Sequence, residues 1–178
     1  MPLFYEDDKV RLFKTPCGPY DNNSYLVVCA KTNEGVIIDA PMEPAELLEE
    51  AAGIEVQAIL ITHGHQDHLA GLQEIRVATN APVGAHVADP NSISSGLDFY
   101  VEDGALIKFG MLALEAIYTP GHTDGSVCYL YTGHLFSGDT LFPGGPGKSK
   151  SPEKLREIIL SITEKLFVLP DDIFLLPG

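Results

Sequence analysis

The sequence predicts a mixed α/β fold in which two β-sheets pack face to face, with helices on the outside. Three observations support this class. Short apolar, β-branched runs that end in turn signals recur along the whole chain. Segments with helical spacing stand between these runs and again near the end of the chain. Sheets arranged in layers need helices to cover their outer faces, and these segments can supply them.

The first half of the chain is predicted to form four strands and one helix. Asn22 and Asn23 are interpreted as turn formers between the first two strands. The helix has a Pro near its first turn and ends at Gly53. The predicted strands are residues 9–15, 25–29, 35–39 and 56–61, and the predicted helix is residues 44–52.

The second half is predicted to form a short helix, six strands and a longer helix. The longer helix begins at Ser151 as N-cap with Pro152 after it, and it ends before Pro170. Apolar residues at 155, 158, 159, 162 and 166 predict one buried face for it. His134 is expected in an exposed hairpin turn, and His86 is expected to be structural. The short helix is residues 69–78, and the strands are residues 82–86, 106–109, 112–118, 127–131, 135–137 and 173–176.

Four groups that can bind a divalent metal follow the predicted strand 56–61 within six residues. They are His63, His65, Asp67 and His68. Imidazole and carboxylate ligands crowded at a strand end are typical of a metal site. His63 and His65 are two residues apart, so in an extended segment they point the same way and can share one ion. Asp67 and His68 are adjacent, and they are better placed to hold a second ion. The spacing therefore predicts a site for two ions.

Two later motifs add ligands. They are Pro-Gly-His-Thr at residues 120–123 and Ser-Gly-Asp-Thr at residues 137–140. With Thr-His-x-His-x-Asp-His at residues 62–68, the chain resembles the metallo-β-lactamase fold superfamily. The resemblance implies a four-layer αββα sandwich with the ligands in loops at one edge of the sheets. It implies a first metal site of His63, His65 and His122, a second that begins with Asp67 and His68, and Asp139 as the bridge. Asp39 would support the ligands.

Within the superfamily, the chain looks most like the glyoxalase II-type hydroxyacylglutathione hydrolases. That likeness implies one or two zinc ions, with iron as the alternative, and a metal-bound hydroxide that Asp67 orients toward a thioester. A thiol leaves readily because its pKa is about 8.5. Lys148 stands where related thioesterases hold the substrate's carboxylate, although a plain surface lysine is an equal alternative. The family's lactamases commonly carry Cys where Asp139 stands, which favours thioesters over β-lactams.

Two other functions stay open on the sequence alone. A persulfide dioxygenase of similar sequence would hold a single iron with His63, His122 and Asp139. A non-catalytic module that keeps a relic metal site is the other alternative. In the resembling family a His follows a final Pro-Gly and serves the second ion, whereas this sequence stops at Gly178. We therefore expect the single domain of residues 1–178 to lack the end of the family domain and to fill its first metal site before its second.

Composition limits the partners. The net charge is −14, with 11 Lys and Arg against 25 Asp and Glu, which argues against nucleic-acid binding. No apolar run approaches the ~20 residues that span a bilayer, and no signal peptide is visible. The three cysteines, Cys17, Cys29 and Cys128, are scattered and are expected to be free thiols in a reducing cytoplasm. We expect a small-molecule substrate. The oligomeric state does not follow from the sequence.

Overall fold

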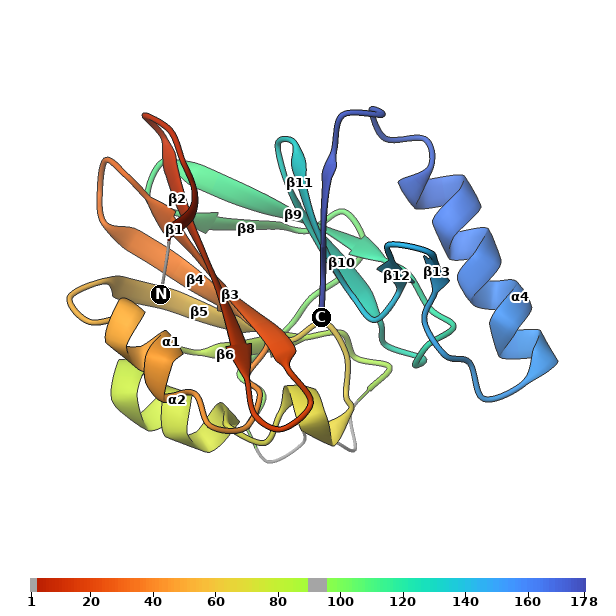
Figure 1. Cartoon of the computed structure of the whole chain (residues 1–178), viewed down its shortest axis with the longest axis horizontal. Helices are drawn as coiled ribbons and strands as arrows, with labels where there is room; N and C mark the ends of the chain where they lie inside the picture. Colours follow the sequence, from red (N-terminus) through yellow and green to blue (C-terminus); the bar gives the residue numbers. More distant parts are fainter. Residues whose placement is uncertain (1–2, 90–95) are drawn as a thin grey trace.

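The computed structural model describes residues 3–89 and 96–178. Two mixed sheets face each other, with α1 (Ala45–Glu50) and α2 (Leu72–Thr79) on the outside of one and α4 (Pro152–Ser161) on the outside of the other (Figure 1). This arrangement confirms the predicted four-layer αββα sandwich. Both helical layers lie against strands that are apolar on both faces, as expected for sheets covered on two sides.

The first sheet has seven strands within the described residues. They lie in chain order, with antiparallel pairing among the first four and parallel pairing from β4 onward. The strands are β1 (Leu3–Glu6), β2 (Val10–Cys17), β3 (Asn22–Cys29), β4 (Glu34–Ile38), β5 (Glu55–Leu60), β6 (Val83–Ala85) and β7 (Phe99–Tyr100).

The second sheet has five strands within the same residues. A separate β-hairpin of β12 (Leu141–Phe142) and β13 (Gly145–Pro146) follows β11 in the chain. The five strands lie in the order β14 (Phe174–Pro177), β11 (His134–Gly138), β10 (Val127–Tyr131), β9 (Leu112–Tyr118) and β8 (Leu106–Phe109), with only the pair β11–β14 parallel.

Side-chain alternation along the strands separates the core into layers. In β3, Tyr25 and Val27 point between the sheets, whereas Leu26 and Val28 point toward α1 and α2. In β10, Tyr129 points between the sheets and Cys128 points toward α4. Because β3 and β10 are buried on both faces, residues 25–29 and 127–131 read as continuous apolar runs.

The structure also corrects several predicted details. Asn22 and Asn23 lie inside β3 rather than in a turn, and β1 was not predicted. His134 lies in β11 and is 6% exposed, so its predicted exposure was wrong. Its ring packs against Tyr5 and Phe174, which come from opposite ends of the chain.

The helix near the end of the chain buries three of the five apolar residues that were predicted to form its buried face. Ser151 caps it, since its side chain accepts a hydrogen bond from the backbone N–H of Lys154. It continues into a π-helical turn over Ile162–Leu166. Ile158, Ile162 and Leu166 are buried, but Leu155 and Ile159 are more than 40% exposed, so they do not belong to the buried face. In the described parts of the chain, no helix is long and apolar enough to cross a membrane.

Candidate metal centre

The predicted ligands come from loops that follow three strands at one edge of the sandwich. His63 and His65 follow β5, His122 follows β9 and Asp139 follows β11. His68 ends a short 3-10 turn over Gln66–His68. Strands β9 and β11 are both antiparallel to β10, so they end on the same side. The sheets approach closely there, because a Cβ added to Gly138 would lie 2.6 Å from Thr62 Oγ1.

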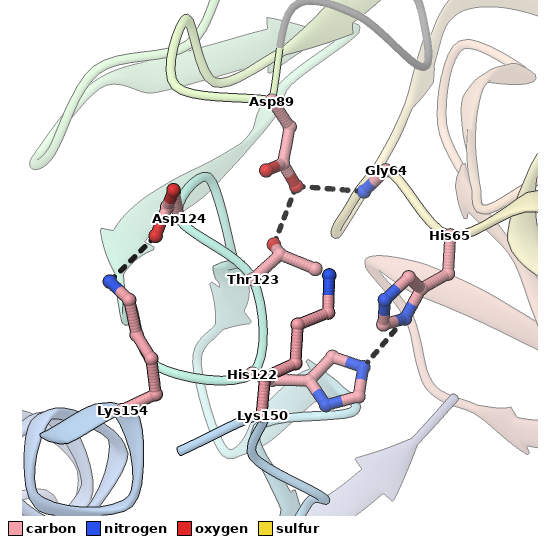
Figure 2. A pocket seen from close by; sticks show the side chains of 8 residues that line it. All are labelled: Gly64, His65, Asp89, His122, Thr123, Asp124, Lys150 and Lys154. Atoms are coloured by element: carbon pink, nitrogen blue, oxygen red, sulfur yellow. Dashed lines mark hydrogen bonds and ion pairs between the residues drawn. The ribbon is translucent and has the colours of Figure 1, made fainter. Parts of the chain in front are cut away.

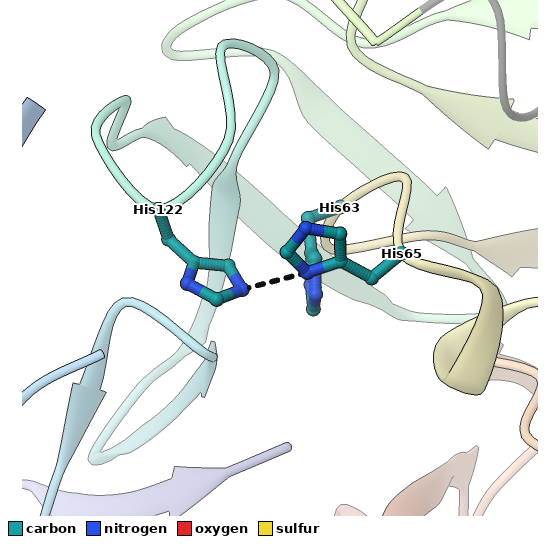
Figure 3. Close-up of side chains that lie close together, drawn as sticks. All are labelled: His63, His65 and His122. Atoms are coloured by element: carbon teal, nitrogen blue, oxygen red, sulfur yellow. Dashed lines mark hydrogen bonds between the residues drawn. The ribbon is translucent and has the colours of Figure 1, made fainter. Parts of the chain in front are cut away.

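Three histidine rings converge in the space between these loops (Figure 3). The ring centroids of His63, His65 and His122 are 4.6–4.8 Å apart, and His65 Nδ1 lies 2.9 Å from His122 Nε2. One nitrogen of each ring lies within 4.8 Å of the other two, and the same holds for one ligand atom each of His63, His68 and Asp139, which form a second group. The structure therefore brings together five of the six predicted ligands.

Hydrogen bonds to the other ring nitrogens orient these histidines. His122 Nδ1 lies 2.7 Å from the carbonyl oxygen of Lys148, which can only accept, so Nδ1 carries the proton and Nε2 keeps its lone pair. Thr62 Oγ1 donates to Asp39 and therefore accepts from His63 Nδ1 at 3.0 Å. His63 Nε2 is buried without a hydrogen-bond partner. The lone pair of His63 Nε2 is therefore free, whereas Nε2 of a neutral His122 faces His65 Nδ1 at 2.9 Å.

Asp39 and Asp139 fix His68 from its two sides. Asp39 Oδ2 lies 2.9 Å from His68 Nδ1, and Asp139 Oδ1 lies 3.4 Å from His68 Nε2. The other oxygen of Asp139 lies 3.5 Å from His122 Nε2, so this carboxylate lies between His68 and a histidine of the first group. Burial alone would lower the pKa of His68, but the charges of Asp39 and Asp139 outweigh it and raise the pKa to about 10.

Protonation differs between His68 and the pair His63 and His65. Burial, followed by the neighbouring histidines, holds the pKa of His63 well below its usual value. Burial, the ring of His122 and the charge of Lys150 lower the pKa of His65. Both rings are therefore neutral at neutral pH and can act as ligands, whereas His68 must release a proton before it binds a metal.

Asp67 lies at the rim of the site, outside both groups of converging atoms. Its side chain is 40% exposed, and Oδ2 is 3.9 Å from His68 Nε2. Asn22, which was predicted mainly as a turn former, donates from Nδ2 to this same Oδ2 at 2.9 Å. Nothing in the local sequence distinguishes this role of Asn22, because the two residues are 45 positions apart.

A cavity of about 330 Å³ opens beside His65 and His122 (Figure 2). His65 and His122 line it together with Asp89, Lys150 and Lys154. The predicted contact Lys148 is exposed and does not line this cavity, although its backbone carbonyl holds His122. Lys154 forms an ion pair with Asp124 at 2.6 Å (Figure 2). Sequence reasoning missed both Lys150 and Asp89.

Residues 17–177 match the family model described as the metallo-beta-lactamase superfamily. The chain belongs to this superfamily. A hydroxyacylglutathione hydrolase of Polaromonas sp. strain JS666 is 36% identical over 165 residues, which cover 89% of this chain and 62% of that protein. The chain thus spans less than two thirds of that relative. The probable metallo-hydrolase YqgX of Bacillus subtilis strain 168 is 32% identical, over 93% of this chain and 88% of that protein.

Solved structures of the superfamily superpose well on this chain. The BLEG-1 B3 metallo-beta-lactamase gives a TM-score of 0.83 at 27% identity, covering 94% of this chain and 90% of that one. ETHE1 from Myxococcus xanthus gives 0.82 at 29% identity, covering 94% and 74%. TTHA1623 in a di-iron-bound form gives 0.77 at 27% identity, covering 93% and 91%. These structures confirm the fold and include a protein that binds two iron ions.

The residues of this chain fit a metal ion of the kind that the superfamily binds. The clearest sign is His63 Nε2, a buried lone pair without a partner among the described residues, which faces the other ligands. An unpaired buried nitrogen is costly in a protein interior unless it serves as a ligand. The donor set of imidazoles and carboxylates suits zinc or iron.

Proposed function

We propose that the protein is a metal-dependent hydrolase that cleaves a thioester, or a related ester, of a small molecule. The observation that carries this proposal is the position of Asp139, whose two oxygens lie 3.4 Å and 3.5 Å from histidines of the two ligand groups. A carboxylate between two sets of ligands is suited to a pair of ions. The name of the Polaromonas relative, a hydroxyacylglutathione hydrolase, supports the thioester as substrate.

His63, His65 and His122 would hold the first ion, and His68 with Asp67 would begin the second, with Asp139 between them. Zinc is our first choice and iron the second. When bound, the ions supply Lewis acidity, which lowers the pKa of water and polarises a carbonyl.

The chain's own residues would position the reactants. Asn22 holds the Asp67 carboxylate at 2.9 Å, so Asp67 can accept a hydrogen bond from the attacking water in a fixed direction. Lys150 lines the cavity beside His65 and would attract an anionic group of the substrate. Lys148, the contact predicted first, stays a proposal for a more distant part of the substrate. A cytoplasmic location also stays a prediction, which the free thiols of Cys17, Cys29 and Cys128 support.

A substrate panel tests the proposal. Zinc-loaded protein should hydrolyse at least one thioester, with S-lactoylglutathione and short acyl-thioesters as probes, faster than a chromogenic β-lactam. Iron-loaded protein should show no oxygen uptake with glutathione persulfide. Faster β-lactam turnover would reverse the substrate assignment. Oxygen uptake without thioester hydrolysis would support the dioxygenase, which uses His63, His122 and Asp139.

A further inference from the structure

Asp89 lines the cavity beside His65 and His122 and contacts both loops that carry the ligands of the first metal site. Its Oδ2 accepts from the backbone N–H of Gly64 at 2.8 Å and from the hydroxyl of Thr123 (Figure 2). Its Oδ1 accepts from the backbone N–H of Gly125 at 3.0 Å. Gly64 separates His63 from His65, and Thr123 follows His122. One carboxylate therefore joins two loops whose sequence positions differ by about sixty residues.

The surroundings of Asp89 are fitted to a carboxylate. All three contacting groups donate, and an ionised carboxylate is the side chain that only accepts. Thr123 is itself fixed by Ser126, whose Oγ accepts from the Thr123 backbone N–H at 3.0 Å. A Cβ added to Gly125 would lie 2.7–2.8 Å from Asp89, so residue 125 has room only for glycine. The close fit leaves Asp89 little freedom to move.

We infer that Asp89 is a positioning residue, which sets the distance between His122 and the pair His63 and His65 and so preorganises the first metal site. Without the contacts of Asp89, the two loops would be held together at the site by the contact of their ligand rings, His65 Nδ1 and His122 Nε2 at 2.9 Å, and by the ion itself. Metal affinity would then include the cost of ordering both loops. The inference rests on the proposed metal site but not on thioester chemistry, so failure of the substrate panel leaves it standing.

The test is a zinc titration of metal-free protein against a competing chromophoric chelator, which measures affinity rather than activity. In Asp89→Asn the amide NH₂ must face at least one of the three donors, whichever way it is turned. We expect this variant to bind the first zinc equivalent about 10 to 100-fold more weakly, the range typical when groups that orient metal ligands are lost. The matched control is Asp98→Asn, which removes a carboxylate that accepts from Val83 N at 2.8 Å and pairs with Arg76.

Thr123 supplies an independent pair of variants. Thr123→Val keeps the shape but loses the hydroxyl, and we expect it to weaken zinc binding about tenfold or more. Thr123→Ser keeps the hydroxyl, so its zinc affinity should stay within about threefold of the original protein. This rescue separates the hydrogen bond to Asp89 from a general effect of substitution at the loop.

Three results would overturn the inference. The first is zinc affinity within threefold of the original protein in both Asp89→Asn and Thr123→Val. The second is an equal loss of affinity in the Asp98→Asn control, which would indicate general destabilisation. The third is equal zinc affinity in Thr123→Val and Thr123→Ser, and this comparison decides alone if Asp89→Asn does not fold.

Discussion

Asp39 is a single buried carboxylate on which both ligand groups depend. It is 1% exposed, and its Oδ1 accepts from Thr62 N at 2.8 Å. Its Oδ2 accepts from Thr62 Oγ1 at 2.8 Å and from His68 Nδ1 at 2.9 Å. Thr62 Oγ1 also contacts His63 Nδ1 at 3.0 Å, so Asp39 helps to orient the His63 ring through Thr62. The informative perturbation is Asp39→Asn, because Asn keeps the volume and tolerates the φ of 62° better than most residues do.

The expected loss of stability in Asp39→Asn follows from the three donors around Asp39. The amide of Asn cannot accept from all of them, so at least one buried donor loses its partner, which costs about 1–3 kcal/mol. Loss of a hydrogen bond to a charged group costs about 1.5–3 kcal/mol more. Together we expect the free energy of unfolding of the metal-free protein to fall by about 2.5–6 kcal/mol. At about 2–4 °C per kcal/mol for a chain of this size, Tm should fall by about 5–24 °C.

The assay is urea unfolding of chelator-treated protein followed by circular dichroism, with zinc affinity measured in parallel. The control is Asp7→Asn, since Asp7 also accepts from two backbone N–H groups, of Lys9 and Val10, and from Tyr5 Oη. Asp7 is exposed, so water can replace these bonds, and its substitution should cost less than about 1 kcal/mol. A fall below about 0.5 kcal/mol for Asp39→Asn, with unchanged zinc affinity, would refute the reasoning.

The remaining predictions concern single contacts around the site. His63→Ala should lose at least one equivalent of zinc and most turnover while the far-ultraviolet spectrum stays unchanged; full zinc content, measured by elemental analysis, would contradict its role as ligand. Asn22→Ala frees the Asp67 carboxylate, so kcat for a thioester should fall about tenfold with zinc content unchanged, and an equal loss of zinc would show a different role. Gly121→Ala should lower the free energy of unfolding by about 2 kcal/mol or more, because φ is 132° and the added Cβ would overlap the backbone of α4. The control is Gly133→Ala, whose added Cβ meets nothing within 4 Å, so its free energy of unfolding should stay within about 0.5 kcal/mol of the original in the same urea experiment.

The parts of the fold that sequence predicted well are those whose signal lies within one element. The strands β8, β9 and β10 have the predicted bounds, because each is a short apolar run closed by turn residues. The ligand cluster after β5 could be predicted equally well, since its four groups fall within six residues. Local pattern was enough in both cases.

The parts that sequence missed depend on contacts between distant segments. His134 looked like a turn residue, but β1 and β14 bring Tyr5 and Phe174 against its ring. Leu155 and Ile159 follow helical spacing, yet α4 covers its sheet with a narrow face, and the outer part of the stripe stays exposed. Nothing in the local sequence distinguishes Asp89 from other acidic residues. It reaches the site because β6 lies parallel to β5, so the segments after both strands lie at the same edge of the sheet.

The end of β14 is tied to β3 across the two sheets, and this has a kinetic consequence. Tyr25 Oη donates to the carbonyl of Pro177 at 2.6 Å, and Asn23 Nδ2 donates to the same carbonyl at 3.0 Å, over 152 and 154 residues of sequence. Contacts of such long range form late, because their loop-closure entropy must be met before they give any stabilisation. We therefore expect zinc capture during refolding to lag behind the recovery of strand structure and to follow the slowest folding phase.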